Sequence, residues 1–400
     1  MNNAKHVRLL VSDRSYSECK FVDINSSTHN EFVNDIDIVP YDMKLFNGDI
    51  INLNNYNNIT SNIKSKTTVL AGVLILKNNR SFGRTNNKKR LLYKCIPDDK
   101  HLPVFLVPYE IKIGFSKSYK NKYVTFKYDY WTDEHPCGLL HETLGDVDNL
   151  DVFYEYQLYC KSLHYSMIHF TKQTRQVLNE QTNEEYIDEI VENSNYHIHD
   201  YRNKYIFTID PKSSTDYDDG FSIEEYNIDN IQIGWKVNVY ISNVFLWLET
   251  LKLWNSFTKR VSTIYLPDRK RPMLPTILSD TLCSLQENEH RFALTMEVVI
   301  NNDGTINQDI PVEYKNVIIK VKKNYHYDDE NMFDDIHFNN LFALSKKISK
   351  TVKTNHELVS FWMVFMNMRI GSMLNEKQVG IFRTSFIQDK DLRSDIDTKL

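Results

Sequence analysis

The chain has 400 residues, 41% of them hydrophobic and 25% charged, a balance that is ordinary for a globular protein of two to four domains. Its net charge of −5 excludes a surface that is basic overall, so any nucleic-acid path must be local. The five cysteines form no Cys-x-x-Cys pair, which argues against a cysteine zinc site and favours a reducing compartment.

We expect the protein in the cytoplasm or nucleus. Its Asn-, Ile-, Lys- and Tyr-rich composition suggests an AT-rich genome, such as that of a virus or a protist. If the protein is viral, we expect it in the host cytoplasm or the virion. The first eight residues lack the apolar core of a secretory signal. The most apolar run, residues 358–368, is far shorter than the roughly 20 residues that span a bilayer. We therefore expect no membrane partner.

The first part of the chain, to about residue 103, is typical of short strands separated by turns. Residues 45–53 alternate around Asn47-Gly48, which predicts a hairpin. A second all-β unit is predicted over residues 104–163, where residues 123–131 have alternating apolar positions. Residues 164–199 are richer in Glu, Asn and Gln and are predicted to form a helical connector.

The second β unit interleaves lysines with aromatic residues, a pattern that fits single-strand binding by stacking beside a basic track. A barrel strand with aromatics inside and lysines outside explains the same pattern equally well. Residues 77–90 form a further basic stretch. Taken alone, its residues 88–90 are better explained as a solvated loop. We assign RNA contact to Lys117, Lys120, Tyr123 and Lys127.

From residue 205 onward the pattern is mixed, which predicts an α+β domain. Strands are expected at residues 237–244 and 294–300, helices at 245–257 and 342–352, and a hairpin turn at 301–304. No histidine has partners at a spacing that suits a metal, and no Ser/His/Asp motif is present.

Four aspartates follow the apolar residues 205–209 in one short loop: Asp210, Asp216, Asp218 and Asp219. Several carboxylates delivered to one point make a negative pocket that is costly unless a cation occupies it. Such hard oxygen ligands suit Mg²⁺ or Mn²⁺, so phosphodiester hydrolysis is the first hypothesis. An acidic loop alone is more often a solvated turn, and the order of its residues fits a calcium loop poorly.

Around this loop the chain resembles the RNase II/RNase R family of 3′→5′ exoribonucleases, closest to the exosome-type eukaryotic members. Their catalytic RNB domain opens with an Asp-Pro…Asp-x-Asp-Asp motif, and all four carboxylates are matched here. The segment 200–202 is similar to the family's Asp-Leu-Arg approach. Further matching blocks are Thr-Ile-Tyr-Leu-Pro-Asp-Arg at 263–269, Arg-Pro-Met-Leu-Pro at 271–275, Leu-Ser-Asp-Thr-Leu-Cys-Ser-Leu at 278–285 and Arg-Phe-Ala-Leu at 291–294.

The resemblance implies a multidomain fold of two N-terminal cold-shock (OB-fold) barrels, a connector and an α+β RNB domain. We place these at residues 1–103, 104–163, 164–199 and 200–400. It also implies that the four aspartates bind Mg²⁺ or Mn²⁺ and catalyse hydrolysis. Asp210 and Asp219 would hold the principal ion, and Asp216 and Asp218 a second ion and the attacking water. Tyr265 matches the aromatic that packs on the terminal nucleotide, and Arg269 in the same block is assigned to RNA contact.

Three departures from the family pattern bear on function. Asn243 stands where the family has an aspartate, and Ser360 and Phe361 replace two carboxylates near the RNA end. The chain stops at Leu400 and lacks the arginine-rich segment and the S1 domain that follow in the family, so we expect an incomplete RNB domain.

Our reading is a magnesium-dependent 3′→5′ exoribonuclease that hydrolyses single-stranded RNA to nucleoside 5′-monophosphates. Two alternatives stay open. One is an RNA-binding protein with impaired catalysis. The other is half of a split nuclease, completed by a separately encoded C-terminal RNB/S1 chain.

Overall fold

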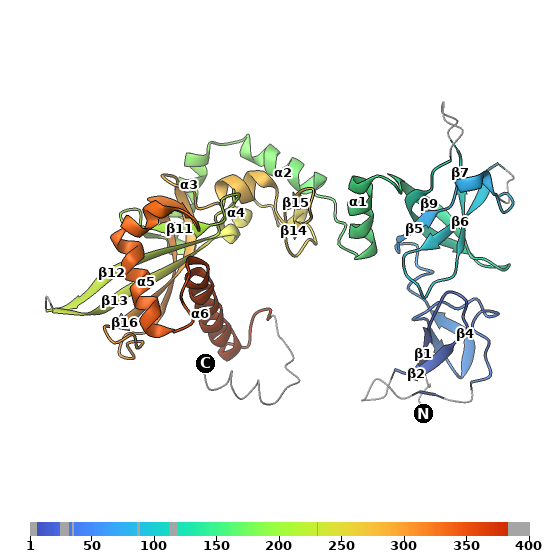
Figure 1. Ribbon diagram of the computed structural model, residues 1–400, viewed down its shortest axis with the longest axis horizontal. Coiled ribbons are helices and arrows are strands. Elements are labelled where there is room, and N and C mark those ends of the chain that lie inside the picture. Colours follow the sequence, from blue (N-terminus) through green and yellow to red (C-terminus); the bar gives the residue numbers. More distant parts are fainter. Residues whose placement is uncertain are drawn as a thin grey trace. The chain divides into compact units, whose positions relative to one another are not determined.

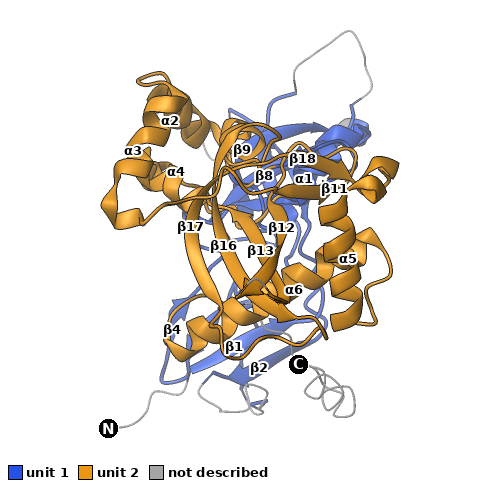
Figure 2. Ribbon diagram, turned by 90° about the vertical axis from the view of Figure 1, so that its left-hand side faces the viewer, with its two compact units in different colours: residues 1–165, 264–271 blue, residues 166–263, 272–400 orange. Residues whose placement is uncertain are grey.

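The computed structural model (Figure 1) describes residues 6–24, 32–33, 36–85, 89–111, 119–229 and 231–382. Its internal contacts divide the chain into two units, which Figure 2 distinguishes by colour. Unit 1 comprises residues 1–165 and 264–271, and unit 2 comprises residues 166–263 and 272–400. The short segment 264–271 thus belongs to unit 1, although residues of unit 2 flank it on both sides in the sequence.

Unit 1 begins with a four-stranded antiparallel sheet in the order β2-β1-β3-β4. Its strands are β1 (His6–Val11), β2 (Cys19–Asp23), β3 (Ile50–Asn52) and β4 (Asn55–Thr60). The predicted hairpin around Asn47-Gly48 is wrong, because β3 pairs with β1 and β4 and not with the residues just before Asn47. Asn47 and Gly48 instead brace β1: the Asn47 Oδ1 accepts from the Val11 amide at 3.0 Å, and the Gly48 amide donates to the Leu9 carbonyl at 2.8 Å.

A closed five-stranded barrel follows, in the order β5-β6-β7-β9-β8. Its strands are β5 (Leu70–Leu74), β6 (Leu91–Pro97), β7 (Phe105–Tyr109), β8 (Lys122–Tyr130) and β9 (Cys137–Asp146). Alternate residues fill its interior, including Tyr93, Phe105, Val107 and Phe126. Helix α1 (Leu150–Cys160) comes next and is capped by Asn149, whose side chain accepts from two amides of its first turn.

The barrel corrects the boundary predicted at residue 103. That boundary falls between β6 and β7, which pair over five residues from Leu91↔Tyr109 to Cys95↔Phe105. Residues 104–163 alone hold only three of the five barrel strands, so they cannot close a barrel. Strand β5 also pairs with β8 across about fifty residues of sequence, and the local pattern carries no sign of that contact.

Unit 2 is built on a seven-stranded mixed sheet in the order β10-β17-β16-β13-β12-β11-β18. Its strands are β10 (His199–Asp200), β11 (Phe207–Asp210), β12 (Asp219–Ile228), β13 (Ile231–Ser242), β16 (His290–Asn301), β17 (Glu313–Lys320) and β18 (Lys323–His326). The predicted strands at 237–244 and 294–300 lie almost entirely within β13 and β16. Only the outer pairs β10–β17 and β11–β18 are parallel.

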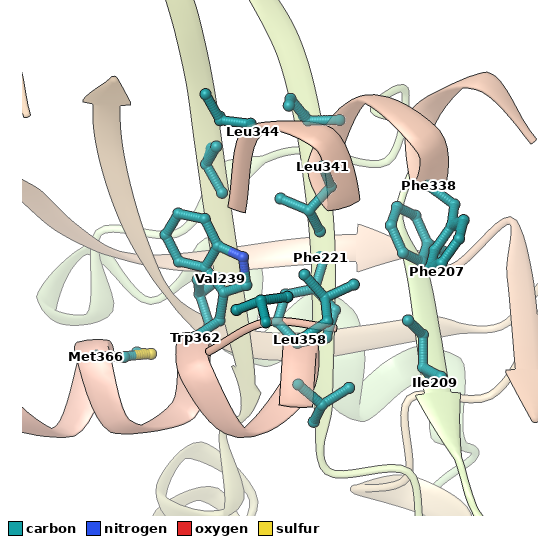
Figure 3. Close-up of a cluster of buried hydrophobic side chains, with 14 of the residues drawn as sticks. Phe207, Ile209, Phe221, Val239, Phe338, Leu341, Leu344, Leu358, Trp362 and Met366 are labelled. Carbon is teal, nitrogen blue, oxygen red and sulfur yellow. The ribbon is translucent and has the colours of Figure 1, made fainter. Parts of the chain in front are cut away.

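The helices of unit 2 are α2 (Ile168–Leu178), α3 (Asn183–Glu192), α4 (Val244–Thr250), α5 (Ile336–Ile348) and α6 (Asn355–Glu376). Helices α5 and α6 pack on one face of the sheet, where Figure 3 shows Phe338, Leu341, Leu358 and Trp362 directed at the strands. Helices α2, α3 and α4 form a second cluster with Phe292 and Ile318. No helix in the described ranges is long and apolar enough to cross a membrane.

Candidate active site

Asp210 and Asp219 lie at the same end of two neighbouring strands. Asp210 is the last residue of β11 and Asp219 the first of β12, and the two strands run antiparallel in register Phe207↔Phe221. Asp210 is only 8% exposed, because β18 covers the other edge of β11. The Tyr327 amide, just beyond β18, donates to the Asp210 carbonyl at 3.0 Å. The strands thus deliver two carboxylates to one point, as the sequence predicts.

These two carboxylates are held in an environment that disfavours negative charge. Burial, followed by the charge of Asp219, raises the pKa of Asp210 to about 7; the charges of Asp218 and Asp216 add to the effect, and a hydrogen bond with Thr208 opposes it. Burial and the charge of Asp218 raise the pKa of Asp219 to about 6. The charges of the other three predicted aspartates therefore all reach Asp210.

The same pair has polar atoms that no hydrogen bond in the structure satisfies. The Oδ2 atoms of Asp210 and of Asp219 are buried and have no hydrogen-bond partner. Buried carboxylate oxygens without donors are costly, and a bound cation would remove that cost. These two residues therefore fit a hard divalent ion such as Mg²⁺ or Mn²⁺.

The fit is weaker for a larger ligand set. In the part of the chain that the structure describes, no three side chains of His, Cys, Asp or Glu are grouped closely enough to hold a metal ion. Asp216 is half-buried and Asp218 is exposed in the loop between β11 and β12. Their charge reaches Asp210, but as they stand they do not complete a metal site with the buried pair.

The acidic loop is held in place by the π-helical turn η4 (Leu278–Leu282) and the residues after it. The Ser284 hydroxyl accepts from the Tyr217 amide at 3.0 Å and donates to the Thr215 carbonyl at 3.1 Å. The Leu285 amide donates to the Tyr217 carbonyl at 2.8 Å. Sequence analysis found this 278–285 block only by resemblance, and the structure supplies its physical role as the support of the loop.

A buried arginine fixes that support in turn. Arg291, 8% exposed, donates from Nε to the Ser284 carbonyl at 2.7 Å and from Nη2 to the Gln286 Oε1 at 3.0 Å. The Asp280 carboxylate accepts from the Thr215 hydroxyl at 3.2 Å. The loop therefore has a connected framework of hydrogen bonds behind it.

Of the three residues that depart from the family pattern, Asn243 and Phe361 have structural roles here. Asn243 caps α4, since its Oδ1 accepts from the Leu246 amide at 3.4 Å, and its Nδ2 donates to the Asn316 Oδ1 at 3.0 Å. On α6, Ser360 is exposed and Phe361 packs beside the main core of unit 2. None of the three offers a carboxylate to the loop.

Tyr265 and Arg269 lie in unit 1, on the hairpin of β14 (Ile264–Tyr265) and β15 (Lys270–Arg271). Tyr265 is 74% exposed, so its ring is available for stacking. The Arg269 Nη2 lies 3.2 Å from the Glu155 Oε1 of α1. Arg269 is thus engaged with a carboxylate in this structure.

A buried neighbour holds the same hairpin more firmly, and sequence analysis gave it no role. Arg271, 6% exposed, donates to both oxygens of Asp268 at 2.8 Å and to the Glu155 Oε1 at 2.7 Å. We call this group the Arg271 clasp. Bidentate pairing to one carboxylate and contact with a second fix the hairpin that presents Tyr265 against α1.

The residues predicted to contact RNA on the second β unit lie in different environments. Lys117 lies outside the described residues. Lys120 is exposed and pairs with Asp148 at 2.7 Å, and Lys127 is half-buried on β8. The Tyr123 ring stacks on Tyr156 of α1, with centroids 4.2 Å apart. This packing covers one face of Tyr123, and its assignment to RNA contact stays a prediction.

Comparison with known proteins bears on these features. Residues 198–335 match the RNB domain family. Exoribonuclease 2 of Cronobacter sakazakii is 40% identical to this chain over 123 residues, which are 30% of this chain and 18% of that protein. Exoribonuclease 2 of Salmonella heidelberg matches over 119 residues at the same identity. The chain spans less than a fifth of the length of these curated relatives.

Solved structures extend the similarity of fold beyond unit 2. The apo form of Mycoplasma genitalium RNase R matches with a TM-score of 0.66 and 17% identity, over 94% of this chain and 62% of that one. The same protein in complex with ribose methylated single-stranded RNA matches with a TM-score of 0.61 and 18% identity, over 86% and 52%. Yeast Ssd1, described as a pseudonuclease, matches with a TM-score of 0.53 and 12% identity, over 86% and 47%.

Proposed function

We propose, from the premise that this chain belongs to the RNB-domain family, that it is a 3′→5′ exoribonuclease acting on single-stranded RNA. The observation that carries the proposal is the buried pair Asp210 and Asp219, whose Oδ2 atoms lack partners and whose pKa values are raised. A fold keeps such a costly arrangement where a cation or a reaction compensates for it. The products would be nucleoside 5′-monophosphates.

In this proposal Asp210 and Asp219 hold a divalent ion, Mg²⁺ or Mn²⁺. When bound, such an ion lowers the pKa of water and neutralises charge that develops on the phosphate. Asp216 and Asp218 would serve a second ion and would orient the attacking water. The water oxygen would attack phosphorus, and the 3′ oxygen of the preceding nucleotide would leave with a proton.

The test is cleavage of a 5′-labelled single-stranded RNA by the purified chain with Mg²⁺, beside the Asp218→Asn variant. We expect a ladder that shortens from the 3′ end and is absent in the variant, with RNA binding retained. Asp309→Asn, an exposed carboxylate of the same unit, is the matched control. Cleavage by the variant at the wild-type rate, or equal loss of binding and cleavage, would refute the role of Asp218.

A second candidate is RNA binding without cleavage. Two observations favour it: Asn243 is committed to capping α4, and no three ligands converge among the described side chains. Yeast Ssd1, which shares the fold, is described as a pseudonuclease. RNA binding by the purified chain without any ladder would favour this candidate over the first.

A third candidate is a split nuclease, in which a separately encoded chain supplies C-terminal RNB and S1 segments. It is supported by α6, which carries apolar residues around its circumference, although only Leu358, Val359, Trp362 and Met366 are buried. A helix that is apolar all round is normally covered on all sides. If cleavage appears only after a family C-terminal segment is added, this candidate is supported. If no cleavage appears even then, RNA binding is the function that remains.

A further inference from the structure

Unit 2 contains a cavity of about 260 Å³ that none of the four aspartates lines. Its wall is formed by the first turn of α3, by α4, by η4, by the start of β16 and by the end of β17. Figure 2 shows α3 and α4 beside β17. Pockets for drug-sized ligands usually measure roughly 300–1,000 Å³, so this cavity suits a smaller ligand.

A lysine in the wall carries a charge that the protein does not pair. Lys320, the last residue of β17, is half-buried, and its backbone pairs with His290 of β16, which also lines the cavity. Among the residues that the structure describes, the Lys320 side chain has no hydrogen bond and no ion pair. An ammonium group that is partly removed from water and has no counter-charge favours an anion beside it.

The first turn of α3 adds hydrogen-bond donors to the same wall. Thr182 caps this helix: its hydroxyl accepts from the Glu185 amide at 3.3 Å, and its amide donates to the Glu185 Oε2 at 2.8 Å. This capping box leaves the amides of Asn183 and Glu184 without an intrahelical partner, and both residues line the cavity. Such amides at a helix N-terminus favour a negative ligand.

A buried donor in the wall provides independent support. Trp247 of α4 is 1% exposed and lines the cavity, and its indole Nε1 has no hydrogen-bond partner. A buried N–H without an acceptor is costly, which points to an acceptor that the protein itself does not supply. The unpaired groups of this wall are thus all donors, and an oxyanion is their complement.

Two carboxylates also line the cavity, and each has a compensating positive partner. Glu184 lies in the first turn of α3, where a negative side chain interacts favourably with the helix dipole. Glu289 lies 3.6 Å from the Nη1 of Arg291. Both glutamates are exposed to water, so neither is forced into the cavity. The charge that remains without compensation is that of Lys320.

We propose that this cavity binds a phosphate-type anion, either inorganic phosphate or the phosphate group of a small monoester, at Lys320, Trp247 and the first turn of α3. An ammonium, two amides and an indole match the several acceptor oxygens of a phosphate better than the two oxygens of a carboxylate. The proposal does not depend on the proposed function, because none of these groups belongs to the acidic loop.

The bound anion would also steady the support of the acidic loop. Arg291, which donates to the Ser284 carbonyl behind that loop, lines the cavity, and so do Thr281 and Leu282 of η4. A ligand that binds the folded state stabilises it. Phosphate should therefore raise the thermal midpoint of the chain, a readout that requires no catalysis.

The test is isothermal titration calorimetry of the full chain in EDTA, which prevents phosphate from binding through a metal at the acidic pair. The probes are inorganic phosphate, ribose 5-phosphate and uridine 5′-monophosphate, and the tightest of them identifies the source of the anion. Lys320→Gln should raise the Kd for inorganic phosphate at least about tenfold. The matched control Lys350→Gln, an exposed lysine of unit 2 outside the cavity, should bind like wild type.

Trp247→Phe removes the indole donor and should also weaken phosphate binding. Thermal unfolding without phosphate shows that each variant is folded, and added phosphate should raise the midpoint of wild type and of the control more than that of Lys320→Gln. If no probe binds in a way that depends on Lys320, or if the control loses as much affinity, the proposal is overturned. Tighter binding of acetate than of phosphate, lost in Lys320→Gln, would also overturn it in favour of a carboxylate ligand.

Discussion

Replacing Asp210 with asparagine should stabilise the protein at neutral to alkaline pH when no divalent ion is present. Burial and Asp219 raise the pKa of this carboxyl from its ordinary 3.8 to about 7. A rise of about three pH units corresponds to roughly 4 kcal/mol at about 1.4 kcal/mol per unit, which is the upper limit of the gain. The asparagine side chain is not ionisable, so the Asp210→Asn variant avoids the cost of a buried charge.

The sign follows from proton binding. Between about pH 4 and pH 7 the folded protein keeps the Asp210 proton while the unfolded chain has lost it, so the folded state binds more protons. The free energy of unfolding of the wild type therefore falls as pH rises through this window and stays low above it. Asp219, with its pKa raised to about 6, contributes in the same direction. The Asp210→Asn variant should show a shallower fall and exceed the wild type at pH 8.

The assay is guanidinium unfolding in EDTA at pH 5 and pH 8, followed by tryptophan fluorescence. Four of the five tryptophans lie in unit 2, namely Trp235, Trp247, Trp254 and Trp362, so the signal reports mainly on the unit that holds the site. Asp309→Asn is the exposed control. Added Mg²⁺ should stabilise the wild type at pH 8 and the variant less, since a ligand stabilises the state that binds it. A variant less stable than wild type at pH 8, or a difference independent of pH, would refute this account of the site.

Two further predictions concern the packing around the site. Arg271→Ala leaves the Asp268 and Glu155 carboxylates of the Arg271 clasp without their shared partner. It should lower the free energy of unfolding by about 3 kcal/mol in thermal or urea melts. The double variant Arg271→Ala/Asp268→Asn should lose less free energy of unfolding than the two single changes added together. Trp362→Phe removes the hydrogen bond from the indole Nε1 to the Ser345 hydroxyl at 2.9 Å and leaves a gap under α6. It should lower the free energy of unfolding by about 2 kcal/mol, measured by denaturant unfolding. Ser345→Ala should lower it by less, and a larger loss for Ser345→Ala than for Trp362→Phe would contradict this packing.

The acidic site was predictable because its information is local. The apolar residues before Asp210 indicate a buried strand, and a strand followed by clustered carboxylates can deliver them only to its own end. What the local pattern could not supply is the burial of Asp210 by β18, more than a hundred residues later in the chain. Burial is the main cause of the raised pKa of Asp210, so the local pattern could not predict that shift either.

The barrel is the part of the fold that the sequence predicted least well. Its strands were visible as apolar runs, but their grouping was predicted wrongly, because closure depends on β5 meeting both β6 and β8. Alternating residues in β8 indicate which side chains share a face, but they do not indicate which face an outside helix covers. The pattern therefore could not show that Tyr156 of α1 stacks on one face of Tyr123, a residue assigned to RNA contact.

The charge of this protein is divided between two chemically different places. Unit 1 carries Arg84, Lys89 and Arg90 at one end of its barrel, and unit 2 gathers negative charge at the ends of β11 and β12. RNA held by basic side chains of this kind would be released by salt and unaffected by chelation, because its phosphates replace counterions. Chemistry at the acidic pair would be abolished by chelation, since the carboxylates repel a phosphate unless a cation stands between them. Affinity and cleavage should therefore respond to different ions, and a chain that binds in EDTA but cleaves only with a divalent ion would use both kinds of site.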